Sequence, residues 1–254
     1  MSGTPRDFQG ELPRLVERHV MLGHVALSIW CPVAPEELID QAIDAYAGET
    51  MAADDDAPGG SAPDFRPPYW ADVWPSAIAL GRRLVGMPLA GRRVLELGAG
   101  VGVPGLAAAQ RGARVLITDR EPVAIEVVRR SAVLNGLVVE TAVLDWNVSQ
   151  EDATVPQSDF DWIVGADLLY DRSHVEPLAG TLAALLRRGG RALIADPDRW
   201  YQGDFVAALE ARGLGVRRQP THFYWDRQAR TVTLIEVGDT PSSSAPTPSS
   251  APTR

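Results

Sequence analysis

Four glycines follow a short apolar run in the segment RVLELGAGVGVPG, residues 93–105. They are Gly98, Gly100, Gly102 and Gly105. The apolar run shows no polar alternation, which is typical of a strand that is buried on both faces. The glycines allow a tight turn and let backbone N–H groups approach a ligand closely. Pro104 suits the first turn of a helix, where its missing N–H costs nothing. Together these features predict a nucleotide-type binding site at a helix N-terminus.

An acid lies at or beside the end of each of five predicted strands. The strands are expected over residues 92–98, 113–119, 138–146, 160–167 and 191–196, and the acids are Glu96, Asp119, Asp145, Asp167 and Asp196. Ligands of open α/β sheets bind at the carboxyl ends of the strands. Each acid alone is equally compatible with a role as a cap. Five of them at one edge indicate a shared site.

Helical patterns separate most of these strands. We expect helices over residues 103–112, 122–136, 174–190 and 205–213, with Gly112, Gly136, Gly189 and Gly213 at their ends. Two further runs, 215–225 and 230–237, are typical of an antiparallel hairpin. The pattern predicts an α/β fold with a Rossmann-like, doubly wound, seven-stranded sheet. The sheet is expected to be mostly parallel, with the antiparallel hairpin at its C-terminal end.

The ends of the chain differ in composition from this region. Residues 52–64 are small, acidic and rich in Gly and Pro, which predicts a flexible loop. Residues 239–254 are rich in Ser, Pro and Thr, which predicts a disordered tail. We therefore divide the chain into an N-terminal extension with its loop (1–64), one domain (65–238) and the tail (239–254).

Composition excludes several classes of protein. The net charge is −9 and no basic stripe stands out, so a nucleic acid partner is not expected. No apolar stretch approaches the roughly 18 residues of a membrane span, and the N-terminus lacks the apolar region of a signal peptide. The single cysteine, Cys31, excludes an internal disulfide and gives no metal cluster. We therefore predict a cytoplasmic protein with no metal site and no membrane partner, and the sequence sets no oligomeric state.

Two cofactors are compatible with the glycine turn. Residues 100–105 satisfy G-x-G-x-x-G, and Asp119 follows at the distance of a ribose-binding acid, as in nicotinamide dinucleotide sites. S-adenosylmethionine also carries a ribose, so Asp119 does not discriminate. Glu96, however, would repel a pyrophosphate and could attract an amino group or a sulfonium. The Asp145 carboxylate could accept a hydrogen bond from the amino group of an adenine. The Trp146 indole could stack on the adenine ring.

The segment ELGAGVG, the acid Asp119 and the segment LDW (144–146) resemble the motifs of class I, seven-strand S-adenosylmethionine-dependent methyltransferases. The resemblance covers roughly residues 65–238. It implies that S-adenosyl-L-methionine is the cofactor. The cofactor-binding residues that it implies are Trp74, Glu96, Gly98, Gly100, Gly102, Asp119, Asp145, Trp146 and Ala166.

A finer resemblance rests on PYWADVWPSAIALGRRL (68–84) and ADLLYD (166–171). Both are similar to the lysine-methyltransferase-like branch, which includes the electron-transfer-flavoprotein β-subunit lysine methyltransferases and nicotinamide N-methylase-like proteins. IADPDRWY (194–201) is similar to a G-D-P-x-R-x-Y stretch there, with Ala195 where glycine is usual. The resemblance implies N-methylation of a protein lysine.

Catalytic roles follow from the D-x-x-Y part of that motif. We expect Asp167 to hold and orient the amine, and Tyr170 to form a wall or a hydrogen bond. Tyr69 and Trp70 are expected to line the acceptor entrance, whereas His174 is expected on the surface. Three alternatives stay open: a small-molecule N- or O-methyltransferase, a nicotinamide-dependent oxidoreductase, and an inactive cofactor-binding module. The partner is accordingly a protein substrate or a small-molecule methyl acceptor.

Overall fold

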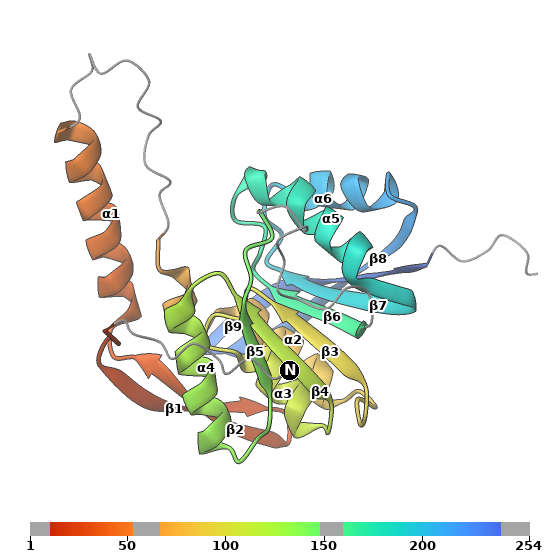
Figure 1. Ribbon diagram of the computed structural model, residues 1–254, viewed down its shortest axis with the longest axis horizontal. Helices are drawn as coiled ribbons and strands as arrows, with labels where there is room; N and C mark the ends of the chain where they lie inside the picture. The colour runs from red at the N-terminus through yellow and green to blue at the C-terminus, as the bar shows by residue number, and fades with distance from the viewer. Residues whose placement is uncertain (1–10, 53–66, 148–159, 240–254) are drawn as a thin grey trace, which may run out of the picture.

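A computed structural model describes residues 11–52, 67–147 and 160–239 (Figure 1). One sheet has seven strands in the order β5-β4-β3-β6-β7-β9-β8. These strands are β3 (Arg93–Leu97), β4 (Arg114–Asp119), β5 (Glu140–Val143), β6 (Phe160–Ala166), β7 (Leu186–Asp196), β8 (Leu214–Trp225) and β9 (Gln228–Asp239). The pairs from β5 to β7 are parallel, and β9 is antiparallel to both β7 and β8. The predicted fold class is confirmed.

Helices cover both faces of this sheet. They are α2 (Pro75–Val85), α3 (Val103–Gln110), α4 (Pro122–Leu134), α5 (Val175–Leu185) and α6 (Gln202–Glu210). The core between α2, α3, α4 and the sheet contains Val94 of β3, whereas the core under α5 and α6 contains its neighbour Leu95. Alternate residues of β3 therefore enter opposite cores. This explains why the sequence of the strand shows no polar face.

One predicted helix ends earlier than its sequence pattern suggests. Helix α5 ends at Leu185, and β7 begins at Leu186, so the prediction of a helix over 174–190 is wrong for its last five residues. Leu186 pairs with Phe160, and the register then shifts so that Arg191 pairs with Trp162. A Cβ on Gly190 would lie 2.8 Å from the carbonyl oxygen of Phe160. Gly189 and Gly190 therefore lie in an irregular part of the β6–β7 pairing and do not end a helix.

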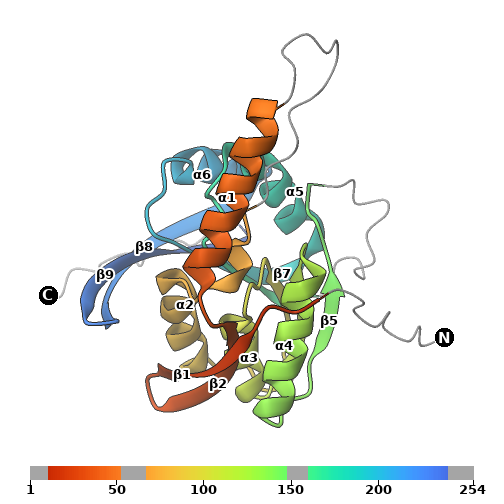
Figure 2. The same cartoon turned by 90° about the vertical axis from the view of Figure 1, so that its left-hand side faces the viewer.

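The N-terminal residues form ordered structure that the sequence pattern did not reveal. Strands β1 (Leu15–Leu22) and β2 (Val25–Pro32) form an antiparallel hairpin, and α1 (Pro35–Ala52) follows it (Figure 2). The backbone N–H of Ser28 donates to Oδ1 of Asn135 at 3.0 Å, and that of Trp30 donates to Oγ of Ser131 at 2.9 Å. Side chains at the end of α4 thus satisfy the outer edge of β2, which ties the hairpin to the sheet domain.

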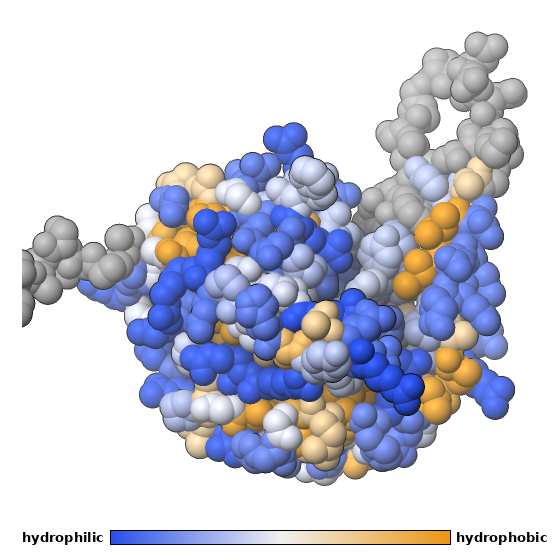
Figure 3. Space-filling view, turned by 180° about the vertical axis from the view of Figure 1, so that it is seen from behind, coloured by the Kyte–Doolittle hydropathy of each residue, from blue (hydrophilic) through white to orange (hydrophobic). Residues whose placement is uncertain are grey.

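The predicted loop 52–64 and tail 239–254 lie almost entirely outside the described residues. The division of the chain into three parts stays a prediction. Within the described part, no helix has both the length and the apolar character that crossing a membrane requires. Seen from behind, hydrophilic residues cover most of the surface and apolar residues show between them in smaller patches (Figure 3).

The single cysteine gives a direct test of how the hairpin packs. Cys31 on β2 is fully buried, and burial raises the pKa of its thiol from 9.0 to about 11. At pH 8 we expect iodoacetamide to modify it at least ~100-fold more slowly in the native protein than in urea, since the thiolate is the reactive form. Mass spectrometry of timed samples measures both rates. Equal rates would mean that β2 is not packed on the core in solution.

Candidate functional site

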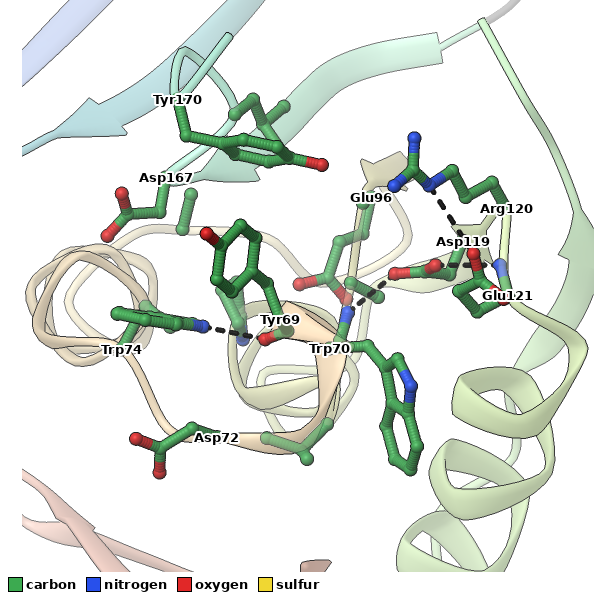
Figure 4. A pocket seen from close by; sticks show the side chains of 18 of the residues that line it. Tyr69, Trp70, Asp72, Trp74, Glu96, Asp119, Arg120, Glu121, Asp167 and Tyr170 are labelled. Atoms are coloured by element: carbon green, nitrogen blue, oxygen red, sulfur yellow. Dashed lines mark hydrogen bonds and ion pairs between the residues drawn. The ribbon is translucent and has the colours of Figure 1, made fainter. Parts of the chain in front are cut away.

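A cavity of about 300 Å³ lies where β3, β4 and β6 end, against the 3-10 turn η1 (Tyr69–Ala71). Figure 4 shows Tyr69 and Tyr170 side by side, with Asp167 on one side of them and Asp119, Arg120 and Glu121 on the other. The volume of the cavity is at the lower end of the range for small-molecule sites. Its lining includes Tyr69 and Trp70 and nine of the site residues proposed from the sequence: Trp74, Glu96, Gly98, Gly100, Asp119, Trp146, Ala166, Asp167 and Tyr170.

Glu96 closes the base of the cavity. Its Oε2 accepts from the backbone N–H of Gly105 at 2.9 Å, in the first turn of α3. A Cβ at Gly105 would lie 2.3 Å from that same oxygen, so only glycine allows this approach. Burial raises the pKa of the Glu96 carboxyl well above its usual value. A carboxyl group therefore occupies the helix N-terminus that would hold the pyrophosphate of a dinucleotide.

Asp119 presents a carboxylate at the end of β4. Its Oδ2 accepts from the N–H of Gly100 at 2.8 Å, and its Oδ1 accepts from the N–H of Glu121 at 2.9 Å. Burial raises the pKa of Asp119 to about 6, although both hydrogen bonds oppose this shift. The two backbone donors hold the group rigidly in the cavity wall. Its remaining lone pairs can accept from hydroxyl groups of a ligand.

The indole of Trp146 forms an apolar part of the wall. A Cβ added to Gly98 would lie 3.0 Å from the ring, so the glycine turn and the indole are in close contact. Trp146 is 7% exposed, and among the described residues its Nε1 finds no hydrogen-bond acceptor. A buried N–H without a partner costs free energy. Because that nitrogen has almost no accessible surface, a ligand in the cavity would contact carbon atoms of the indole ring.

Aromatic rings form the opposite wall. The Nε1 of Trp74 donates to the carbonyl oxygen of Tyr69 at 2.8 Å, which fixes the entry to α2. The rings of Tyr69 and Tyr170 meet edge to face at 5.2 Å, and Tyr170 meets His174 at 4.6 Å. His174 is buried, and its Nδ1 lies 3.0 Å from the carbonyl oxygen of Leu168. The expectation of a surface histidine is therefore wrong, because this ring packs behind Tyr170.

Asp167 is engaged on both carboxylate oxygens. Its Oδ2 accepts from the hydroxyl of Ser76 at 3.0 Å, and its Oδ1 accepts from Nε and Nη2 of Arg199 at 2.7 and 2.5 Å. Asp167 has a positive φ of 61°, which is uncommon for a residue other than glycine. Asp167 is thus a rigid, charge-compensated group. Its predicted role in holding an amine now has to include Arg199.

Two proposed cofactor residues do not line the cavity. Gly102 has a φ of 82° and precedes α3 as its N-cap. Asp145 is partly exposed, and its Oδ1 accepts from the N–H of Asn147 at 2.9 Å. Strand β5 ends at Val143, three residues before the predicted end, so Asp145 lies in the turn beyond it.

Four further residues of the lining have ionisable side chains: Asp72, Arg120, Glu121 and Arg199. Arg120 and Glu121 directly follow Asp119, and Nε of Arg120 lies 3.5 Å from Oε1 of Glu121. Arg199 belongs to the IADPDRWY segment, so its motif was visible in the sequence. Its partner was not visible, since the pairing depends on how β6 and β7 lie next to each other.

Comparison with known proteins places residues 70–211 in a family described as lysine methyltransferase. The chain is 37% identical over 143 residues to an electron transfer flavoprotein beta subunit lysine methyltransferase of Mus musculus, which covers 53% of this chain and 52% of that protein. It is 33% identical over 126 residues to a histone-arginine methyltransferase of Mus musculus, covering 47% and 49%. The chain thus spans about half the length of the curated relatives that it matches.

Solved structures share the fold. A TehB-like SAM-dependent methyltransferase from Corynebacterium glutamicum superposes with a TM-score of 0.51 at 22% identity, covering 81% of this chain and all of the other. Magnesium protoporphyrin IX methyltransferase from Synechocystis, solved with bound SAH, gives a TM-score of 0.51 at 16% identity, covering 65% and 81%.

Proposed function

This chain belongs to the lysine methyltransferase family, and from that premise we propose that it is an S-adenosyl-L-methionine-dependent N-methyltransferase that acts on a protein lysine. One observation supports this proposal above the others. A single cavity joins the glycine turn and Asp119 at one end to Asp167 and Tyr170 at the other. A cofactor and an acceptor could therefore meet within it. The proposed site residues, the domain boundaries and the cytoplasmic location remain parts of this proposal.

The residues of the cavity suit the cofactor. The Asp119 carboxylate is placed to accept from ribose hydroxyls, and the Trp146 indole offers an apolar ring surface to a purine in the same cavity. Trp74, Glu96, Gly98 and Gly100 would surround the remainder. When bound, S-adenosylmethionine supplies the methyl group for an in-line displacement. The chain itself contributes orientation and electrostatics.

An acceptor lysine must first lose a proton. From a pKa near 10.4 this costs about 4–5 kcal/mol at pH 7. A free carboxylate beside the amine would raise its pKa and increase the cost. In this site Arg199 compensates the charge of Asp167. The pair can therefore accept or donate hydrogen bonds that orient the amine without stabilising its ammonium form, and Tyr170 bounds the same space.

The buried glutamate disfavours the nicotinamide alternative. A pyrophosphate at the N-terminus of α3 would have to displace the carboxyl group of Glu96, which already accepts from the N–H of Gly105. Calorimetric titration with S-adenosylhomocysteine and, separately, with NADH decides between the cofactors. Micromolar binding of the first alone supports the proposal. Binding of NADH alone would overturn it.

The acceptor is identified by product analysis. Protein and small-molecule fractions of a lysate are incubated with the enzyme and S-adenosylmethionine carrying a tritiated methyl group, and labelled protein is hydrolysed to amino acids. Methyl-lysine supports the proposal. Methyl-arginine would mean that the chain methylates arginine, as the name of its histone-arginine methyltransferase relative states. Label confined to small molecules would favour a small-molecule N- or O-methyltransferase. Cofactor binding without any labelled acceptor would favour an inactive module.

Binding of S-adenosylhomocysteine is expected to weaken in mild acid. The raised pKa of Asp119, about 6, means that this carboxylate gains its proton as the pH falls through 6 and then accepts fewer hydrogen bonds. We expect the Kd to rise about tenfold between pH 7 and pH 5. Calorimetry across this range measures it, with Asp119→Asn as the control, which should bind weakly but without this pH dependence. A wild-type Kd that stays constant would contradict the assigned role of Asp119.

A further inference from the structure

The loop between β7 and α6 turns two adjacent side chains in opposite directions. Arg199 enters the cavity and pairs with Asp167, whereas Trp200 is 98% exposed. Tryptophan has a large apolar surface and is highly buried on average in folded proteins. A fully exposed indole one residue from the acceptor end of the cavity therefore requires an explanation.

Hydrogen bonds hold this loop in place on both sides of Trp200. The N–H of Arg199 donates to Oδ1 of Asp196 at 2.8 Å, and Nε2 of Gln202 donates to the same oxygen at 3.0 Å. The hydroxyl of Thr233 donates to Oδ1 of Asp198 at 2.6 Å. Gln202 is only 7% exposed. The exposure of Trp200 is thus built into an anchored loop.

Negative charge surrounds the cavity beside this indole. Apart from Glu96, whose pKa burial raises well above its usual value, the lining of the cavity holds four carboxyl groups and two guanidinium groups. Asp204, four residues after Trp200, has a side chain that is 56% exposed and pairs with Nε of Arg172 at 3.7 Å. On the η1 side, α1 carries the exposed acids Glu36, Glu37, Asp40 and Asp44 and no basic residue. This helix stands at the edge of Figure 3 with hydrophilic and apolar residues along it.

The negative charge of this surface indicates which kind of partner it binds. A second copy of the chain would bring a net charge of −9 to an acidic rim, and its sequence contains no lysine to serve as acceptor. A basic polypeptide that contains a lysine would complement the acidic rim and also supply the acceptor amine. Its cationic side chains could also stack on the exposed indole, which is the aromatic side chain that binds cations best.

We propose that Trp200 is the docking contact for the acceptor, and that the acceptor lysine lies in a basic segment of a protein. This inference rests on the proposed function and specifies its substrate class. Trp200 positions the partner, while the loop residue before it, Arg199, holds Asp167 inside the cavity. Docking and amine orientation are thereby coupled through one loop.

Fluorine NMR of the full chain tests the docking contact without requiring turnover. The protein is labelled with 5-fluorotryptophan and saturated with S-adenosylhomocysteine, and the Trp200 signal is assigned from its loss in Trp200→Phe. Two synthetic peptides with one central lysine are titrated, one flanked by arginines and one by glutamates. We expect the arginine-flanked peptide to shift the Trp200 signal. The signal of Trp30, which lies on β2, serves as an internal control and should not move.

The variant Trp200→Ala measures how much Trp200 contributes to the affinity for the peptide. We expect it to weaken binding of the arginine-flanked peptide about 30-fold by calorimetry, the size of an interface hot spot, with an unchanged Kd for S-adenosylhomocysteine. A Trp200 signal that does not respond to the arginine-flanked peptide, or that responds equally to the glutamate-flanked one, overturns the docking proposal. Failure of the unlabelled wild-type protein to bind S-adenosylhomocysteine would instead overturn the proposed function, so the two failures are distinguishable.

Discussion

Replacing Gly100 with arginine is expected to abolish measurable binding of S-adenosylhomocysteine. Gly100 has a φ of 53°, and its N–H donates to Asp119. A Cβ there would lie 3.1 Å from the carbonyl oxygen of Trp70, which is backbone and cannot rotate away. A long side chain must therefore displace η1 from the cavity wall. We expect the Kd to rise at least ~100-fold, which corresponds to about 2.8 kcal/mol.

Gly136→Arg is the matched control for this substitution. Gly136 also has a positive φ, 65°, but no atom lies within 4 Å of the position of its Cβ. Both variants carry the backbone strain of a left-handed residue, about 1–2 kcal/mol, and the same added charge. Only Gly100→Arg contacts the cavity wall. Equal affinities of the two variants for S-adenosylhomocysteine would show that the glycine turn does not contact the cofactor.

Asp167→Asn is expected to separate binding from turnover. Asparagine tolerates a positive φ, and its amide can bond to both Ser76 and Arg199, so the cavity keeps its shape. The Kd for S-adenosylhomocysteine should stay within about threefold of the wild type. Methyl transfer should fall on the order of 100-fold, because the charge that balances Arg199 and orients the amine is lost. Single-turnover kinetics with a saturating acceptor measures this step.

Asp161→Asn controls for the loss of an ion pair on the same strand. Asp161 lies at the opposite end of β6, pairs with Arg187 at 2.5 Å and accepts from the N–H of Arg93 at 2.8 Å. Both variants should lower the free energy of unfolding, by about 1–3 kcal/mol. Only Asp167→Asn should lose turnover. If Asp161→Asn lost turnover to the same extent, the effect would be one of stability and Asp167 would have no special role.

The sequence predicts this fold well wherever a local pattern determines the structure. The glycine turn after β3, the acids Asp119 and Asp167 at strand ends and the C-terminal hairpin all lie where the periodicity places them. The end of α5 could not be predicted in this way. It is determined by the pairing of Leu186 with Phe160, 26 residues earlier in the chain, which no local pattern encodes.

The candidate site shows the same division. Glu96, Gly98 and Gly100 belong to one short motif, so their neighbourhood follows from the chain itself. The pair Asp167 and Arg199 forms because two parallel strands end side by side, although each residue lies in a recognisable motif. Asp145 lies in the turn beyond β5, which ends at Val143, and a strand end is a matter of hydrogen-bond pairing as much as of residue type.

The hairpin of β1 and β2 has a consequence for the order of folding. Its two strands pair locally, but its attachment to Ser131 and Asn135 joins residues more than 100 positions apart. Closing so long a loop costs conformational entropy before any contact repays it. We therefore expect the hairpin to dock after the sheet domain has formed and to detach before the domain unfolds. Its amide hydrogens should exchange with solvent faster than those of β3, as an opening unit of lower stability.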